Sequence, residues 1–206
     1  MKKTKATTTH LPPSTPPTYF NIMATMVNAL EQKDVYTKKH SERVMKLSAL
    51  VARKLDMPPQ EILLLQYASI LHDIGKIGIE PGILQKKGPL NADEYKNIKA
   101  HSLIGEKIIQ PLDFLGEIST FVRQHHERLD GTGYPLGQQK NSLPLESRIL
   151  SVVDAYDAMN SNRPYRPALN RNVIMKELEN NAGSQFDPIV IEALLHIDYK
   201  GKIINN

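Results

Sequence analysis

An apolar segment that ends in two ionisable side chains most constrains how this chain can fold. Residues 62–71 read ILLLQYASIL and follow Pro58 and Pro59, so they predict a buried helix that starts near the prolines. The next two residues are His72 and Asp73. A carboxylate beside a buried helix is unfavourable unless cations or hydrogen-bond donors compensate its charge. The fold must therefore bring compensating groups to this position.

Apolar residues recur at helical spacing along most of the remaining sequence, and no alternating strand pattern of any length is present. The first two helices are expected to have apolar faces made by Phe20, Met23, Val27 and Leu30 and by Val44, Leu47, Val51 and Leu55. Further helices are expected from an Asn91–Glu94 capping box towards His101 and over residues 114–126, 146–160, 171–182 and 188–196, the last capped by Asp187. The predicted fold class is all-α, without an internal repeat.

Length and composition indicate one globular domain. The 206 residues divide into a disordered N-terminal lead over 1–18, rich in Thr, Pro and Lys, and a folded domain over 19–206. The net charge of +4 is too small to indicate a binder of nucleic-acid polymers. The absence of Cys excludes thiolate metal ligands and a Cys nucleophile. No membrane-spanning segment or secretory signal is visible, so we expect a cytoplasmic protein without a membrane partner.

Histidines and aspartates gather near the predicted helix ends and on apolar faces. The set comprises His40, His72, Asp73, His101, His125, His126 and Asp154. Imidazole and carboxylate together suit Fe, Mn, Zn or Ni. Because neighbouring residues on a helix point about 100° apart, His125 and His126 can each serve a different ion, and Asp73 can bridge two ions. Two divalent ions lower the pKa of a shared water and hold phosphate oxygens, so the pattern predicts a dinuclear site for phosphoester chemistry.

Single members of this set have ordinary structural alternatives. A lone histidine such as His40 or His101 is more often a surface or core residue than a ligand. Asp157 can share a helical face with Asp154, and we expect it to support or orient a ligand without binding metal itself.

Four longer motifs occur in order along the chain: LHDIGKIGI, HHERLDGTGYP, VVDAYDAM and SNRPYR. Together they resemble the HD-GYP subgroup of the HD phosphohydrolases, over roughly residues 35–188. The resemblance implies an HD-domain helical bundle and a metal-dependent phosphodiesterase. Members of this family hydrolyse cyclic di-GMP to pGpG, and some continue to GMP, in bacterial second-messenger signalling.

The resemblance also implies which residues bind metal. The family's ligands match His40, His72, Asp73, His101, His125, His126 and Asp154. Asp73 matches the carboxylate that bridges two ions. One ion would be held by His40, His72 and Asp154, and the other by His101, His125 and His126. Fe or Mn are the first candidates for the two divalent ions, with Ni, Zn or Mg as alternatives.

Roles in catalysis and substrate binding follow from the same resemblance. Asp73 and Lys76 are the expected catalytic residues, because Lys76 matches the Lys that contacts the scissile phosphate. Arg163 and Arg166 match substrate-binding positions near the nucleotide, and a guanidinium fork suits phosphate and guanine edges. The loop that names the subgroup consists of Gly133, Tyr134 and Pro135. It is associated with substrate placement and with contacts to other signalling proteins.

Three departures from the family pattern stand out. Tyr36 lies where some members carry a Glu and bind a third metal, so we predict a two-metal site. Glu80-Pro81 reverses the usual order of a Pro and an acid, and Ser102 replaces a Pro that commonly follows the ligand His. These last two changes affect a loop and a helix start, and we expect small consequences.

Two alternatives remain open from the sequence. The chain could bind a cyclic dinucleotide, or a partner protein through the GYP loop, without turnover, although a pure binding module needs no complete ligand set. It could also be an HD phosphohydrolase that acts on another nucleotide, such as a dNTP, (p)ppGpp or a different cyclic dinucleotide. The GYP and RPYR segments argue against a dNTP or (p)ppGpp.

Overall fold

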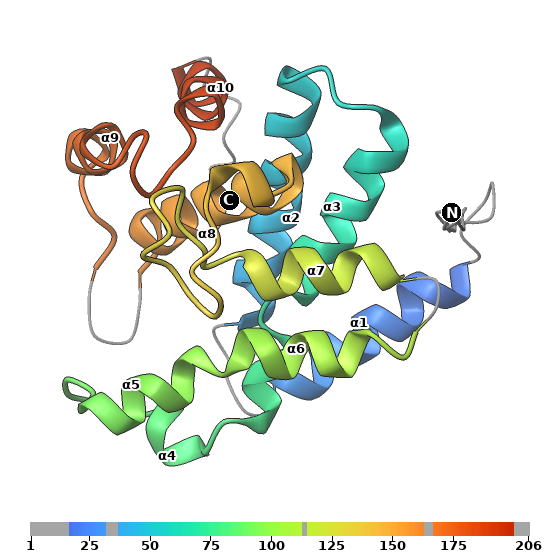
Figure 1. Ribbon diagram of the computed structural model, residues 1–206. Helices are drawn as coiled ribbons and strands as arrows, with labels where there is room; N and C mark the ends of the chain where they lie inside the picture. The colour runs from blue at the N-terminus through green and yellow to red at the C-terminus, as the bar shows by residue number, and fades with distance from the viewer. Residues whose placement is uncertain (1–16, 32–36, 113–114, 163–166, 200–206) are drawn as a thin grey trace, which may run out of the picture.

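Helices dominate the computed structural model, which describes residues 17–31, 37–112, 115–162 and 167–199 (Figure 1). The elements are α1 (Pro17–Glu31), α2 (Thr37–Lys54), α3 (Pro59–Leu71), η1 (Ile74–Gly78), α4 (Pro81–Leu84), α5 (Ala92–Lys99), α6 (His101–Ile109), α7 (Gly116–Gln124), η3 (Lys140–Ser142), α8 (Leu145–Asn160), α9 (Arg171–Asn180) and α10 (Pro188–Tyr199). Among these residues β-pairing is limited to two isolated bridges. The all-α prediction is therefore confirmed. No described helix is both long and apolar enough to span a membrane.

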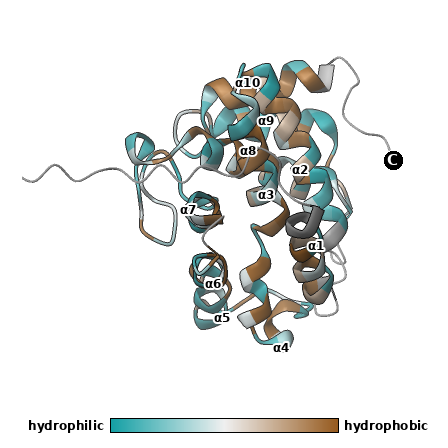
Figure 2. Cartoon of the chain, turned by 90° about the vertical axis from the view of Figure 1, so that its right-hand side faces the viewer, coloured by the Kyte–Doolittle hydropathy of each residue, from teal (hydrophilic) through white to brown (hydrophobic). Residues whose placement is uncertain are grey.

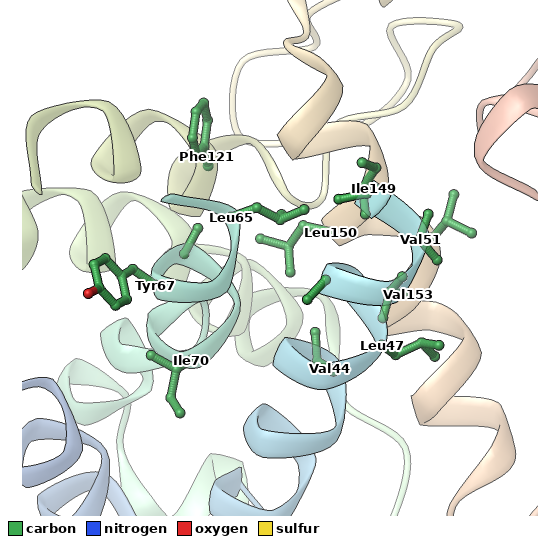
Figure 3. Packing of buried hydrophobic residues seen from close by; sticks show 14 of the residues in the cluster. Val44, Leu47, Val51, Leu65, Tyr67, Ile70, Phe121, Ile149, Leu150 and Val153 are labelled. Carbon is green, nitrogen blue, oxygen red and sulfur yellow. The ribbon is translucent and has the colours of Figure 1, made fainter. Parts of the chain in front are cut away.

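Four helices, α2, α3, α7 and α8, enclose the main apolar core. α2 packs against α3 and α8, and α3 packs against α7. The side chains of Val44, Leu65, Leu150 and Val153 are fully buried and lie close to one another (Figure 3). Burial of one such side chain contributes about 1.5–3 kcal/mol. Hydrophobic residues make up much of α3 and α8 (Figure 2), while α9 and α10 lie on one side of the bundle and α4 and α5 on the other (Figure 1).

Two polar residues singled out in the sequence, His40 and Asp157, lie on the same helix faces as the core. His40 precedes Val44 by one helical turn on α2, and both side chains are buried. On α8, Asp157 lies two turns after Leu150 and is buried as well. The apolar stripes that hold the bundle together therefore also carry these polar side chains into it.

Helix boundaries follow local signals that are visible in the sequence. The expected capping box is present, since Asn91 Oδ1 accepts from the Glu94 backbone N–H at 2.8 Å and the Glu94 carboxylate accepts from the Asn91 N–H at 2.7 Å. The Asp187 cap is also confirmed, because its carboxylate accepts from Ile189 N–H at 3.2 Å. The helix expected to run from this box towards His101 ends at Lys99, and α6 begins at His101 itself. Likewise, the segment expected over 114–126 is shorter, and α7 ends at Gln124, just before two histidines.

A close backbone contact brings the end of α3 against α6. Gly75 in η1 lies so near α6 that a Cβ atom at this position would be 1.8 Å from the carbonyl oxygen of His101 and 2.5 Å from the backbone nitrogen of Gly105. Only a residue without a side chain fits there. This contact fixes the distance between Asp73, two residues earlier, and His101.

We predict that Gly75→Ala destabilises the fold by at least about 2 kcal/mol, because the added methyl group would force η1 and α6 apart. Urea unfolding followed by circular dichroism measures this change. Gly88→Ala is the matched control, since a Cβ atom there meets nothing within 4 Å. Equal stability of the two variants would contradict the close contact.

Candidate metal centre

All seven predicted ligand side chains gather at one place between the helices. Six of them form two groups whose ligand atoms lie within 4.8 Å of one another in each group: His101, His125 and His126 in the first, and His40, His72 and Asp154 in the second. Helix ends contribute most of these residues, while His40 lies within α2 and Asp154 within α8. In each group one member, His126 or Asp154, is partly exposed. We call this partly exposed side the mouth of the centre.

Asp73 lies between the two groups. Its Oδ2 atom is 3.5 Å from His72 Nε2, and its Oδ1 atom is 3.6 Å from His101 Nε2. The side chain is only 6% exposed. Each carboxylate oxygen thus faces a different group, which is the arrangement that a bridging ligand requires.

Four of the imidazoles have their Nδ1 atoms engaged outside the cluster. His72 Nδ1 contacts the Ser69 carbonyl at 2.7 Å, His101 Nδ1 the Ile98 carbonyl at 2.6 Å, His125 Nδ1 the Val122 carbonyl at 2.6 Å, and His40 Nδ1 the Asp157 carboxylate at 2.7 Å. A carbonyl oxygen can only accept, so each of the first three Nδ1 atoms donates its proton. The Nε2 atoms of these rings point into the cluster, and an unprotonated Nε2 atom carries a lone pair.

These lone pairs provide a test of whether a cation fits. His101 Nε2 and His125 Nε2 face each other at 3.3 Å, although both rings use their Nδ1 protons elsewhere. His72 Nε2 is buried and has no hydrogen-bond partner in the structure. Unpartnered buried nitrogens are unfavourable, and a divalent ion bound by them would satisfy them. The donor set of imidazoles and carboxylates suits such an ion.

Electrostatics keep one group of imidazoles neutral. Burial lowers the pKa of His101 and His125, and burial together with the neighbouring His101 lowers the pKa of His126 to about 3. Burial also opposes the charged form of His40, but hydrogen bonds to Asp154 and Asp157 outweigh it and raise the pKa to about 9. His40 Nε2 lies 3.0 Å from Asp154 Oδ1, and in the charged form of His40 it carries a proton. A metal ion bound by His40 and Asp154 would replace this proton.

The two carboxylates of the cluster remain ionised. Burial alone would raise the pKa of Asp73, but the charges of Lys76 and His72 hold it well below its usual range. In Asp154 the same opposing effect of burial is outweighed by the hydrogen bond with His40, so its pKa is also lowered. The cluster therefore offers negative oxygens and the neutral nitrogens of His101, His125 and His126 to a cation.

Asp157 orients His40 from outside the cluster. One of its oxygens accepts from His40 Nδ1 at 2.7 Å, and Arg43 donates to both oxygens at 2.7 and 2.8 Å. A carboxylate held in this way fixes the tautomer and the ring orientation of a ligating His. This is the supporting role expected for Asp157.

Lys76 extends from η1 to the bridging carboxylate. Its ammonium donates to Asp73 Oδ2 at 2.6 Å, and the Lys76 side chain is 23% exposed. Lys76 therefore holds a positive charge at the edge of the centre, where it can meet an anionic ligand.

The GYP loop is anchored by a buried glutamate. Glu127 is 2% exposed, and its two carboxylate oxygens accept from the backbone N–H groups of Leu136 at 2.7 Å and Gln138 at 2.9 Å. Gly133 passes so close to this segment that a Cβ atom would lie 2.4 Å from Arg128 N. The loop thereby brings the ring of Tyr134 onto His126, with the ring centroids 4.7 Å apart.

Some expectations differ from the structure or fall outside it. The geometric argument allowed His125 and His126 to serve different ions, whereas both belong to the group with His101, and their ring centroids are 3.9 Å apart. Which ion each histidine would serve stays a prediction. Arg163, Arg166 and Tyr36 lie outside the described residues. Sequence reasoning missed Glu127, although its position directly after the HH doublet was a signal.

Comparisons with known proteins identify the family of this chain. The HD domain family matches residues 24–190. The chain belongs to the HD domain family. A cyclic di-GMP phosphodiesterase from Thermotoga maritima is 36% identical over 183 residues, which cover 87% of this chain and 49% of the relative. The family resemblance that the motifs indicated is thus confirmed.

Two further similarities bear on this HD domain. A 3'3'-cGAMP-specific phosphodiesterase from Vibrio cholerae is 36% identical over 80% of the chain and 36% of its own length. A solved HDG"Y"P protein from Bdellovibrio bacteriovorus shares the fold, with a TM-score of 0.66 and 21% identity over 88% of this chain and 60% of that one. The chain spans about half or less of the length of these curated relatives.

We predict that Asp157→Asn lowers the affinity for Mn²⁺ by about 10- to 100-fold, because an amide cannot accept from both His40 and Arg43 as the carboxylate does. Isothermal titration calorimetry of the metal-free protein measures this affinity. Asp93→Asn, an exposed change on α5, serves as the control. An unchanged affinity in Asp157→Asn, with the fold intact by circular dichroism, would show that Asp157 does not orient a ligand.

We predict that Glu127→Gln loosens the GYP loop, because one of the two backbone N–H groups would face an amide N–H and lose its acceptor. The cost is about 1–3 kcal/mol of local stability. Hydrogen–deuterium exchange should show faster exchange at Leu136 and Gln138 while α3 and α8 stay protected. Glu117→Gln, on the exposed side of α7, should leave both rates as they are. The anchoring role is refuted should the two variants exchange alike.

Proposed function

We propose that this HD domain hydrolyses a phosphodiester bond of cyclic di-GMP at a pair of divalent ions, giving pGpG and, through a second cleavage, GMP. The substrate is inferred from relatives named as cyclic di-GMP phosphodiesterases at 34–36% identity. The chemistry is inferred from the side chains of the centre. Both lines of support meet in one family, whose HD domain spans most of this chain.

The observation that carries the proposal is the position of Asp73. Its two oxygens lie 3.5 and 3.6 Å from nitrogens that belong to different ligand groups. Phosphoester hydrolysis by two metals needs a ligand that holds both ions next to the same phosphate. A single-metal or purely structural cluster has no need for a carboxylate shared in this way.

The seven side chains would hold the two ions in the division described above. His40, His72 and Asp154 would hold one ion, His101, His125 and His126 the other, and Asp73 would bind both. Fe or Mn are the first candidates, and Ni, Zn or Mg are alternatives. Bound ions of this kind lower the pKa of a shared water and withdraw negative charge from the phosphoryl oxygens.

The chain's own residues would bind and orient the substrate. Lys76, already within 2.6 Å of Asp73, would stabilise the charge that gathers on the scissile phosphate. Arg163 and Arg166 remain predicted contacts of the nucleotide, and loss of Arg163 would mainly raise KM. We further propose that the GYP loop contributes to substrate placement and to contacts with other signalling proteins.

A second substrate has specific support. Several relatives are named as 3'3'-cGAMP-specific phosphodiesterases, and one of them is 36% identical to this chain. The two cyclic dinucleotides share the phosphodiester ring and differ in one base. The same centre would hydrolyse either, so the choice depends on contacts to the bases.

The test is a turnover assay with the protein loaded in turn with Mn²⁺, Fe²⁺, Ni²⁺ or Mg²⁺, with products separated by chromatography. Cyclic di-GMP should yield pGpG or GMP with at least one ion. We predict that Asp73→Ala loses both bound metal and turnover, because its two carboxylate oxygens face different ligand groups at 3.5 and 3.6 Å. Asp93→Ala is the control for a lost surface carboxylate.

Other outcomes of this assay are equally informative. Protein that binds two equivalents of metal and cyclic di-GMP but forms no product with any ion is a binding module, and the hydrolase proposal fails. Turnover of cGAMP at a rate well above that of cyclic di-GMP replaces the substrate with the second candidate. Turnover at the parent rate in Asp73→Ala overturns the proposed centre.

A further inference from the structure

We propose that Lys99 binds the phosphate of the cyclic dinucleotide that is not attacked, and that it does so from a position fixed by two tyrosine rings. This inference deepens the proposed function and rests on it. Lys99 is the last residue of α5, the helix that directly precedes His101. It contributes no metal ligand and belongs to none of the motifs that indicate the family.

Two aromatic rings hold the Lys99 ammonium beside the mouth of the centre. Its Nζ atom lies 4.5 Å from the centroid of the Tyr95 ring and 5.2 Å from that of the Tyr134 ring. Tyr134 in turn stacks on His126, the partly exposed member of its ligand group. The ammonium is thus one aromatic ring away from the predicted metal ligands, on the side that solvent reaches.

The charge of Lys99 is not neutralised by an acid in the described part of the chain. Other cations near the centre are matched: Lys76 meets Asp73 at 2.6 Å and Arg43 meets Asp157 at 2.7 Å. Around Lys99 the structure places rings, and no carboxylate forms an ion pair with it there. Rings attract a cation through their faces but accept no strong hydrogen bond. The three ammonium protons can therefore serve an anion.

The chemistry of a cyclic dinucleotide supplies that anion. The molecule carries two phosphodiesters in one ring, so when one lies at the ions and Lys76, the other lies within the width of the same ring. The second phosphate keeps its negative charge. In the proposed arrangement it would lie outside the metal cluster, on the side of the mouth. Lys99 offers a positive charge there, and Tyr95, which is 50% exposed, offers a flat face beside it. A base can stack on such a face.

Kinetics with two substrates test the role of Lys99. Cyclic di-GMP has a second phosphate, whereas bis(p-nitrophenyl) phosphate has only the one that is cleaved. In Lys99→Met we expect the KM for cyclic di-GMP to rise about tenfold, as for the loss of one charge-assisted hydrogen bond, with kcat changed by less than about twofold. The KM for the small substrate should move much less, and Lys99→Arg should restore most of the affinity for cyclic di-GMP.

A binding measurement gives a readout that does not depend on turnover. A hydrolysis-resistant phosphorothioate analogue of cyclic di-GMP, titrated calorimetrically into the metal-free protein, should bind about tenfold more weakly to Lys99→Met than to the parent. Lys96→Met is the matched control, because Lys96 is exposed on the same helix and removes the same charge.

The results separate the two proposals. The inference is overturned if Lys99→Met and Lys96→Met have the same KM and the same Kd, or if both substrates are affected equally, since an equal loss indicates a disturbed centre. If the parent protein cleaves the small substrate but never cyclic di-GMP, the proposed function fails and the role of Lys99 fails with it.

Discussion

The buried carboxylate of Asp73 is the group on which the rest of the centre depends. It lies just after α3, with a nitrogen from each ligand group at 3.5 and 3.6 Å and the Lys76 ammonium at 2.6 Å. A charge in this position is tolerated only while positive partners surround it. Its distance from His101 is set by the contact between Gly75 and α6. The packing of η1 on α6 and the position of Asp73 therefore depend on the same residue, Gly75.

Helix ends orient several of the predicted ligands. The last carbonyls of a helix have no partner within it, and three such carbonyls, those of Ser69, Ile98 and Val122, accept the Nδ1 protons of the histidines three residues further on. The same contact satisfies the helix end and fixes which imidazole nitrogen faces the cluster. These three predicted ligands are therefore oriented by backbone carbonyls, without the help of an ion.

Much of this arrangement was predictable because its signals are local. His40 stands on the same stripe as Val44, and the polar pair after residues 62–71 interrupts an obviously buried helix. The features that could not be predicted are those that depend on contacts between residues distant in sequence. The HH doublet draws attention to Glu127 but does not indicate that its carboxylate binds the backbone of Leu136 and Gln138, and nothing near Lys99 indicates that Tyr134 will lie against it.

Helices and loops carry different parts of the candidate site, and this difference bears on substrate choice in the proposed function. The ligand set is held by helices and their ends, whereas Tyr134 belongs to a loop held in place by Glu127. Relatives with equal identity to this chain are named for cyclic di-GMP in one case and for 3'3'-cGAMP in another. In the proposed function both substrates would present the same phosphodiester to the ions, so the metal centre would not distinguish them. Discrimination would then arise where the bases lie, on side chains around the mouth, and these can change without disturbing the contact that fixes Asp73.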